Sequence, residues 1–342
     1  MRTFPSGIPL GIDKLVDRYG RVARSLRVSV TDRCNLRCLY CMPAGRIRWF
    51  PKSHLLSFEE IRRLVAILVR LGVSDVRLTG GEPLLRHDLP VLVRMLRTIP
   101  ELQGLSITTN GLLLESMAAP LLEAGVDRFN VHLDALEPGT FREASRRDAL
   151  DRVLGGLAEL ERLEALPIKL NIVLMRGIND DQIPAFAELA RTRPFQVRFI
   201  ELMPLGGGEP LELDRLVPGR EVRERIEASH PLIPIGRDRP SAPATVYRFT
   251  DGVGDIGFIN PVTEPFCRDC DRIRLTADGM LRNCLFSRQE ADLKTLVRAG
   301  ATDEKIAGAV RDEVVAKGPG GCLELGEYYR ERIPRKMWQI GG

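Results

Sequence analysis

The sequence predicts an α/β protein, an open, partial (βα)6 barrel of the TIM type with a smaller α+β C-terminal domain. Six strand-like runs alternate with amphipathic helical stretches, which indicates parallel strands joined by right-handed crossovers. Six strands are too few to close an eight-stranded barrel, so the predicted sheet stays open. Beyond residue 236 the pattern changes to short strands, which predicts a second unit of different architecture.

The barrel is expected to occupy residues 1–235. Its strand-like runs begin near Leu26, Asp75, Leu105, Asp127, Ile168 and Gln196. The helices are expected from residue 57 onward and near residues 89–97, 112–124, 150–163, 183–193 and 220–228. The first of these begins with a capping box, Ser57-x-x-Glu60, followed by apolar residues spaced for one buried face. Residues 205–209, which are rich in glycine, are expected to be a flexible connector.

The second domain is expected to occupy residues 236–342. A stretch rich in proline and charge, residues 231–243, separates it from the barrel. Short strands are expected at 245–250, 255–259, 272–276 and 280–284, and Ala277-Asp278-Gly279 is typical of the turn between the last two. Two helices, at 289–298 and 303–316, are expected to complete the domain.

Composition excludes several classes of protein. The chain has 342 residues, of which 44% are hydrophobic and 28% charged, and its net charge of +4 is ordinary for a soluble globular protein. It lacks a run of about 20 apolar residues and a signal peptide, so we expect a cytoplasmic protein without a membrane partner. Aromatic residues make up only 6% of the chain, which leaves little for base stacking and argues against a nucleic-acid partner.

The cysteines point to metal chemistry. Their number is odd, seven, which argues against a disulfide framework. Six of them form two groups of three, Cys34-x3-Cys38-x2-Cys41 and Cys267-x2-Cys270-x13-Cys284. Thiolates clustered in this way favour a soft metal. A structural zinc site requires four nitrogen or sulfur ligands, and each group offers three cysteines. Three thiolates per site favour an iron–sulfur cluster with one open iron. Structural zinc and plain buried cysteines are the alternatives.

The residues around the first group carry a resemblance to a known family. The run from Ser29 to Cys41, SVTDRCNLRCLYC, resembles the cluster loop of the radical S-adenosylmethionine (SAM) enzymes, and Gly80-Gly81-Glu82-Pro83 resembles their second motif. Three further features resemble the GTP 3′,8-cyclases of molybdenum-cofactor biosynthesis. They are TDRCN at the first group, Arg272-Ile273-Arg274 after the second cysteine pair, and the terminal Gly341-Gly342.

The resemblance implies two [4Fe–4S] clusters and SAM as cofactors. Cys34, Cys38 and Cys41 would hold the first cluster, whose open iron binds SAM. The implied SAM contacts are Tyr40, Gly81, His132 and Met203. Each has a simpler interpretation: a core aromatic residue, a strand-to-helix turn, a satisfied strand histidine and a core methionine. His132 departs from the family, which usually has serine at this position.

The resemblance also implies that Cys267, Cys270 and Cys284 hold the second cluster, whose open iron binds the guanine end of GTP. The remaining cysteine, Cys322, follows Gly318-Pro319-Gly320-Gly321, which is typical of a mobile loop. We expect it to be a free thiol rather than a fourth ligand.

Cations in the strands point to an anionic substrate. Arg27, Arg77 and Lys169 stand in otherwise apolar strands, and burying an unpaired charge is costly, so an anionic ligand is expected there. Bidentate arginine suits phosphate oxygens. The GTP contacts expected on these grounds and from the resemblance are Arg27, Arg77, Thr108, Lys169, Arg272, Ile273 and Arg274. Arg198 is a weaker candidate of the same type.

The implied activity is a GTP 3′,8-cyclase of the lyase class. A 5′-deoxyadenosyl radical would take H3′ of GTP, and C3′ would then attack guanine C8. The product, (8S)-3′,8-cyclo-7,8-dihydroguanosine 5′-triphosphate, belongs to the first step of molybdenum-cofactor synthesis. The implied partners are an electron donor and the downstream cyclic pyranopterin monophosphate synthase, and the chain is expected to be a monomer or homodimer.

Two other interpretations stay open at this point. One is a radical SAM enzyme that modifies peptides and carries an auxiliary cluster. The other is a non-catalytic iron–sulfur or zinc protein that senses redox state or binds nucleic acid. That second interpretation leaves the Gly-Gly-Glu-Pro turn and the six β/α units unexplained.

The resemblance also gives the C-terminal tail a role. In the cyclase family the terminal Gly341-Gly342 is functionally required, and two residues without side chains can enter a narrow site.

Overall fold

The structure, a computed structural model, describes residues 14–203, 205, 213–323 and 335–341. The expected connector beyond Leu205 and the last residue, Gly342, lie outside the described residues. Six parallel strands form the centre of the sheet, each paired with the next along the chain. They are β1 (Ser25–Ser29), β2 (Asp75–Thr79), β3 (Gly104–Thr109), β4 (Arg128–His132), β5 (Ile168–Leu174) and β6 (Phe195–Glu201).

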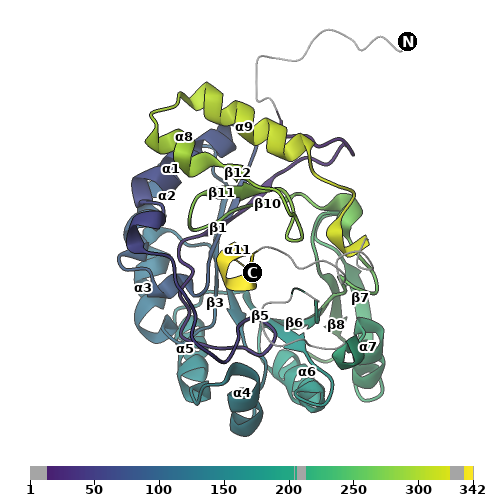
Figure 1. Cartoon of the computed structure of the whole chain (residues 1–342). Coiled ribbons are helices and arrows are strands. Elements are labelled where there is room, and N and C mark those ends of the chain that lie inside the picture. Colours follow the sequence, from purple (N-terminus) through teal and green to yellow (C-terminus); the bar gives the residue numbers. More distant parts are fainter. Residues whose placement is uncertain (1–13, 204, 206–212, 324–334, 342) are drawn as a thin grey trace, which may run out of the picture.

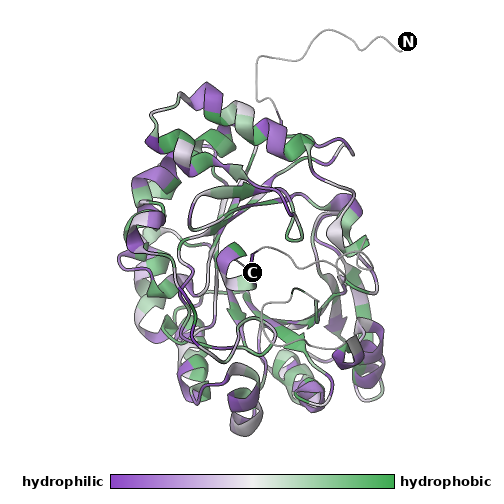
Figure 2. Cartoon of the chain, viewed as in Figure 1, coloured by the Kyte–Doolittle hydropathy of each residue, from purple (hydrophilic) through white to green (hydrophobic). Residues whose placement is uncertain are grey.

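Helices cover the convex face of this curved sheet (Figure 1). They are α1 (Phe58–Arg70), α2 (Leu89–Arg97), α3 (Leu114–Ala124), α4 (Pro138–Ser145), α5 (Leu150–Arg162), α6 (Ile183–Thr192) and α7 (Gly219–Glu227). The expected capping box begins α1, where the side chain of Ser57 accepts from the Glu60 amide. In Figure 2 these helices combine hydrophobic and hydrophilic residues, as expected for helices that bury one face.

The C-terminal part of the chain extends the sheet at both of its edges. On one side β10 (Arg272–Leu275) pairs in parallel with β1, and β11 (Met280–Arg282) and β12 (Ala291–Asp292) follow. On the other side β9 (Asp255–Ile259) pairs in parallel with β6, and β8 (Thr245–Phe249) and β7 (Leu232–Gly236) follow. The result is one open sheet of 12 strands, which confirms the predicted partial barrel.

Three helices complete the described chain: α8 (Leu293–Arg298), α9 (Asp303–Val315) and the short α11 (Met337–Ile340). The sequence-based expectation differs from the structure in three places. Helix α4 was not expected, β7 lies in the stretch expected to be a separator, and the helix expected from residue 289 begins only at Leu293, after β12. The division of the chain at residue 236 stays a prediction.

The strands place apolar and charged residues on opposite faces of the sheet. Leu26, Val28, Val76 and Leu78 are buried in the core between sheet and helices. Alternate side chains of a strand point to opposite faces, so the positions between them, such as Arg27 and Arg77, line the interior of the barrel. Among the described residues, none of the helices has the length and apolar character that a membrane crossing requires.

Candidate functional site

Both groups of cysteines face one cavity inside the barrel, which we call the thiol cavity. Cys34, Cys38 and Cys41 line it from the loop after β1, and Cys267, Cys270 and Cys284 line it from the loops before β10 and after β11. All six are free thiols. The implied SAM contacts lie in the same wall: Tyr40, Gly81, His132 and Met203. The two groups, more than 220 residues apart in sequence, are therefore parts of one site.

Helix α4, which the sequence did not predict, holds the loop of the first group. The Arg37 amide donates to the carbonyl of Ser145 at 3.0 Å, and the Leu39 amide donates to that of Ala144 at 3.0 Å. The Arg37 side chain donates back to the carbonyl of Cys34 at 2.7 Å. These contacts fix the turn between the first and second cysteines.

The Gly80-Gly81 turn packs directly on the backbone that leads into the first group. The Gly81 amide donates to the carbonyl of Thr31 at 2.8 Å. A Cβ on Gly81 would lie 2.4 Å from the carbonyl oxygen of Arg33, so no side chain fits at this position. The following Glu82 is 1% exposed and accepts from the amide of Asn110 at 2.7 Å. Close approach to the cysteine loop is thus one reason for these glycines.

His132 forms a tight polar cluster beside the first group. Its Nε2 lies 2.7 Å from the Tyr40 hydroxyl and 2.7 Å from a carboxylate oxygen of Asp134. Although burial lowers the pKa of His132, the Asp134 carboxylate and Cys38 raise it well above its usual range. Cys38, His132 and Asp134 bring one ligand atom each to within 4.8 Å of one another. Both residues expected to contact SAM here are therefore fixed by Asp134.

Two buried cations hold the loops of the second group. Arg21 is 8% exposed and donates to the carbonyl of Cys267 at 2.8 Å while it pairs with Asp17 at 2.6 Å. Lys317 is 3% exposed and donates to the carbonyl of Cys270 at 2.9 Å. Sequence reasoning missed both residues, because nothing in the local sequence indicates which distant loop they contact.

The thiols of the two groups differ in acidity. Burial raises the pKa of Cys34 to about 12, and it raises that of Cys41 as well. Burial also acts on Cys270, but the charges of Arg272 and Lys317 more than offset it and lower the pKa to about 6. Metal binding requires the thiolate, so a metal must displace protons at the first group. At the second group the nearby cations favour the thiolate form that a metal requires.

A second cavity, the basic cavity, adjoins the thiol cavity on the barrel interior. The two share four cations, Arg27, Arg77, Arg198 and Arg272. Further side chains of the basic cavity include Lys169 and Arg128, which sequence reasoning missed. Seven side chains in its wall are arginine or lysine and three are aspartate. The strand register sets the cations side by side, since Arg27 lies between Arg77 on β2 and Arg274 on β10.

The cations of the basic cavity repel one another. Burial, together with the charges of nearby Arg198 and Arg128, lowers the pKa of Lys169 to about 7, against the weaker effect of Asp238. Burial and Arg198 likewise lower the pKa of Arg77 to about 9. An anion in the cavity would reverse these shifts, because a nearby negative charge favours the charged form of each base.

Two of the predicted arginines carry buried nitrogens without a partner. Nε of Arg272 and Nη1 of Arg274 are buried and have no hydrogen-bond partner among the described residues. The Arg272 guanidinium stacks over the Phe266 ring at 4.6 Å from its centroid. Unsatisfied buried donors are costly, so this arrangement points to a ligand with acceptor oxygens.

The other predicted substrate contacts take different positions. Thr108 lines the thiol cavity and Lys169 the basic cavity. Ile273 is fully buried in the core next to Leu26 and lines neither cavity, which leaves only its backbone for the expected contact.

The C-terminal segment enters the barrel interior. Figure 1 shows α11 inside the arc of the sheet, and Met337 and Trp338 line the thiol cavity. The Ser29 hydroxyl on β1 donates to the carbonyl of Ile340 at 3.0 Å. A Cβ on Gly341 would lie 2.2 Å from that hydroxyl oxygen, and the φ of Gly341 is +83°. Glycine is therefore required at this point.

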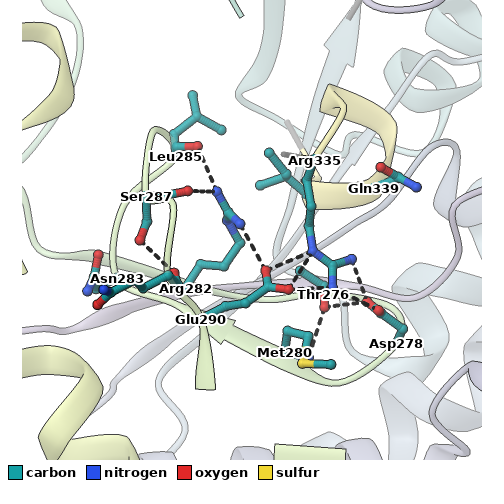
Figure 3. Close-up of polar contacts among 12 residues, drawn as sticks. Thr276, Asp278, Met280, Arg282, Asn283, Leu285, Ser287, Glu290, Arg335 and Gln339 are labelled. Carbon is teal, nitrogen blue, oxygen red and sulfur yellow. Dashed lines mark hydrogen bonds and ion pairs between the residues drawn. The ribbon is translucent and has the colours of Figure 1, made fainter. Parts of the chain in front are cut away.

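An ion-pair network fixes the start of this segment (Figure 3). Arg335 makes two hydrogen bonds of 2.9 Å to the carboxylate of Asp278 in the hairpin turn. It also pairs with Glu290 at 2.6 Å, and Glu290 in turn pairs with the fully buried Arg282 at 2.9 Å. Arg282 stands two residues before Cys284, so one network contacts both the C-terminal segment and a loop of the second group.

Comparison with known proteins agrees with this geometry. Residues 28–190 match the model of the radical SAM superfamily, and residues 195–321 match that of the Molybdenum Cofactor Synthesis C family. The GTP 3′,8-cyclase of Syntrophomonas wolfei is 41% identical over 328 residues, which cover 96% of this chain and 100% of the relative. The chain belongs to the GTP 3′,8-cyclase family. The family member of Pelotomaculum thermopropionicum is 43% identical, with 95% of this chain and 99% of the relative covered.

Solved structures support the fold of this cyclase family member. SAM-bound SuiB of Streptococcus suis superposes with a TM-score of 0.59 at 15% identity, covering 86% of this chain and 69% of that one. At this identity the likeness concerns the fold alone, and it confirms the radical SAM type of partial barrel.

Proposed function

We propose that the chain is a GTP 3′,8-cyclase, which converts GTP to (8S)-3′,8-cyclo-7,8-dihydroguanosine 5′-triphosphate with SAM in the first step of molybdenum-cofactor synthesis. One observation carries the proposal. Two groups of three thiols line one cavity, and that cavity adjoins a second one in which cations outnumber carboxylates. Membership of the cyclase family supports the same activity. A peptide-modifying enzyme would not need the pair Arg272 and Arg274.

The first group fits a [4Fe–4S] cluster with bound SAM. Cys34, Cys38 and Cys41 provide three soft ligands on one loop, and the neighbouring wall offers polar atoms for SAM at Tyr40 and His132. Gly81 and Met203 would complete that contact. When bound, cluster and SAM together supply the 5′-deoxyadenosyl radical that takes H3′ of GTP before C3′ bonds to guanine C8. The chain's own contribution is to hold, orient and shield the reactants.

The second group fits a second [4Fe–4S] cluster. Cys267, Cys270 and Cys284 line the same cavity as the first group and the implied SAM contacts, so a base bound there would share one cavity with SAM. Arg272 and Arg274, which follow the Cys267–Cys270 pair, would fix the nucleotide by donating to its phosphate oxygens through the nitrogens that lack partners among the described residues.

The basic cavity fits the triphosphate. Its cations outnumber its carboxylates by four, seven against three. A nucleoside triphosphate carries about four negative charges near neutral pH, so its binding would neutralise the excess. Arg27 and Arg77 stand where the two cavities join, which would place the ribose between the phosphates and the base. Lys169 and Thr108 would add a point charge and a hydroxyl.

Assay of the products tests this proposal. The reconstituted enzyme is incubated anaerobically with GTP, SAM and dithionite, and the products are identified by mass. We expect the cyclised triphosphate, 5′-deoxyadenosine, and about eight irons per chain from two four-iron clusters. Cys34→Ala should abolish 5′-deoxyadenosine while about four irons remain in the second cluster. Wild-type 5′-deoxyadenosine formation by that variant, or zinc in place of iron, would contradict the assignment.

The remaining features of the proposal concern organisation and partners. Residues 1–235 would supply the SAM site, and residues 236–342 the second cluster, the two arginines and the Gly-Gly tail. An external electron donor and a downstream synthase that makes cyclic pyranopterin monophosphate would act with this enzyme, as monomer or homodimer. Seven free thiols favour a reducing compartment such as the cytoplasm.

A further inference from the structure

A fourth thiol stands beside the second group. Cys322, in the short helix η6 (Gly321–Leu323), lines the thiol cavity together with Cys267, Cys270 and Cys284. The turn that carries it packs on Cys267, since a Cβ on Gly320 would lie 2.7 Å from the Cys267 sulfur. Cys322 and Cys284 also pack against the same buried cluster, which contains Phe286 and Ile340. The sequence predicts a free thiol on a mobile loop, whereas the structure places this thiol in the lining of the cavity that holds the proposed cluster ligands.

The turn before Cys322 is built to bring it there. The Arg21 guanidinium donates to the carbonyls of Gly318 and Pro319, at 2.5 and 2.7 Å, and to the carbonyl of Cys267 at 2.8 Å. One buried side chain thus ties the turn to the Cys267 loop. At Gly320 a Cβ would lie 2.2 Å from the Cβ of Cys267 and 2.7 Å from its sulfur. Only glycine permits this approach.

We infer that Cys322 is the fourth protein ligand of the second cluster in the nucleotide-free enzyme and that GTP displaces it. This inference rests on the second cluster of the proposed function. A [4Fe–4S] cluster has four irons, and three cysteines leave one of them open. Cys322 lines the same cavity as the three proposed ligands, on a turn that packs against Cys267, so its thiol is placed to take that iron. Thiolate is a soft donor suited to it.

The exchange involves bonds and protons but no electrons. When Cys322 binds, a sulfur–iron bond forms and the thiol proton leaves to solvent. When GTP binds, a donor atom of its guanine takes the iron, the sulfur–iron bond breaks and the thiolate regains a proton. Both ligands need the same iron, so they compete. Cys322 would protect the cluster until substrate arrives.

The affinity for GTP tests the displacement. Wild type, Cys322→Ala and Cys322→Ser are reconstituted anaerobically, and GTP binding is measured by equilibrium dialysis without SAM. Apparent affinity falls by the fraction of enzyme that is competent to bind. If about nine-tenths of the free enzyme carries ligated Cys322, removal of the thiol should tighten GTP binding roughly tenfold. Should Cys322→Ala fail to load iron, Cys322→Ser preserves the side-chain volume with a poorer ligand.

Oxidation of the second cluster alone tests the ligand. The first group is removed by Cys34→Ala, Cys38→Ala and Cys41→Ala, and the remaining cluster is treated with ferricyanide and followed by electron paramagnetic resonance and iron analysis. A cluster with four cysteine ligands should keep its four irons, whereas the Cys322→Ser form should lose one and give a three-iron cluster. Added GTP should leave the Cys322 thiol of the parent open to alkylation by iodoacetamide.

The outcomes separate the two levels of the proposal. Equal iron loss in parent and Cys322→Ser, with unchanged GTP affinity, would leave Cys322 a free thiol and overturn the inference while the second cluster stands. Protection by Cys322 with unchanged GTP affinity would overturn the displacement. Absence of iron from the second group, or one zinc per chain in its place, would overturn the inference and the proposed second cluster together.

Discussion

Replacement of Arg335 by alanine should release the C-terminal segment from the barrel without unfolding the protein. The Arg335 side chain is 12% exposed and its partners Asp278 and Glu290 are 9% and 23% exposed. Loss of one partner of a fully buried ion pair costs about 3–5 kcal/mol. Because this network is partly exposed and Glu290 keeps its pair with Arg282, we expect about 2–4 kcal/mol, which shifts the docking equilibrium roughly 30- to 1,000-fold.

Two measurements check this prediction for Arg335→Ala. Carboxypeptidase should remove the last residues much faster than in wild type, and the cyclised nucleotide should be lost while iron content and SAM cleavage are retained. Arg220→Ala is the matched control, because it breaks an exposed ion pair with Glu224 on α7, away from the C-terminal segment. Digestion and cyclisation rates within twofold of wild type would show that the network does not hold the tail.

The remaining predictions concern the substrate, the tail and pH. Arg274→Ala should weaken GTP binding about 10- to 100-fold without changing SAM cleavage in the absence of GTP. Replacement of the exposed Arg268 by alanine should change neither GTP binding nor SAM cleavage. Equal GTP dissociation constants for Arg274→Ala and wild type, measured by equilibrium dialysis, would refute this prediction. Gly341→Val, like deletion of Gly341-Gly342, should abolish cyclisation while both clusters stay intact. Gly45→Val is the control and should keep cyclisation, because a Cβ at Gly45 meets no neighbour. A fully active Gly341→Val enzyme would remove the tail from the mechanism. Burial raises the pKa of Glu313 to about 7, so the folded state holds a proton that the unfolded state loses, and stability should fall as the pH rises from about 4.5 to about 7. In Glu313→Gln the urea midpoint of unfolding should depend less on pH across that window. A pH dependence of the midpoint equal to that of wild type would refute the assignment of this effect to Glu313.

Local patterns predicted the barrel because its units are local. The strand-like runs alternate with helices along the chain, and the six observed strands begin within one residue of the predicted positions. Helix α4 was not predicted because it has only eight residues and contains Pro138 and Gly139. Tertiary packing therefore stabilises it more than helix propensity does. The pairing of β10 with β1 was also not predicted, because strands nearly 250 residues apart produce no periodic pattern in the sequence.

The same distinction holds for the site. Spacing in the sequence revealed both cysteine groups, but their meeting in one cavity depends on β10 closing beside β1. Cys322 was predicted to be free because its position beside the second group arises from the fold of the Gly318–Gly321 turn and from Arg21, which lies near the start of the described chain. Its role as a ligand stays a proposal.

The cations were predictable for a different reason. Each strand of the barrel meets two requirements at alternate positions: apolar residues toward the helices stabilise the fold, and residues toward the interior are free to serve the substrate. A charge at an inward position, such as Arg27, Arg77 or Lys169, opposes the apolar pattern around it and lowers stability when no anion is bound. The pKa of Lys169, which burial lowers to about 7, reflects that cost. A charged residue in a buried strand is therefore informative about function, because folding alone gives no reason for it to be there.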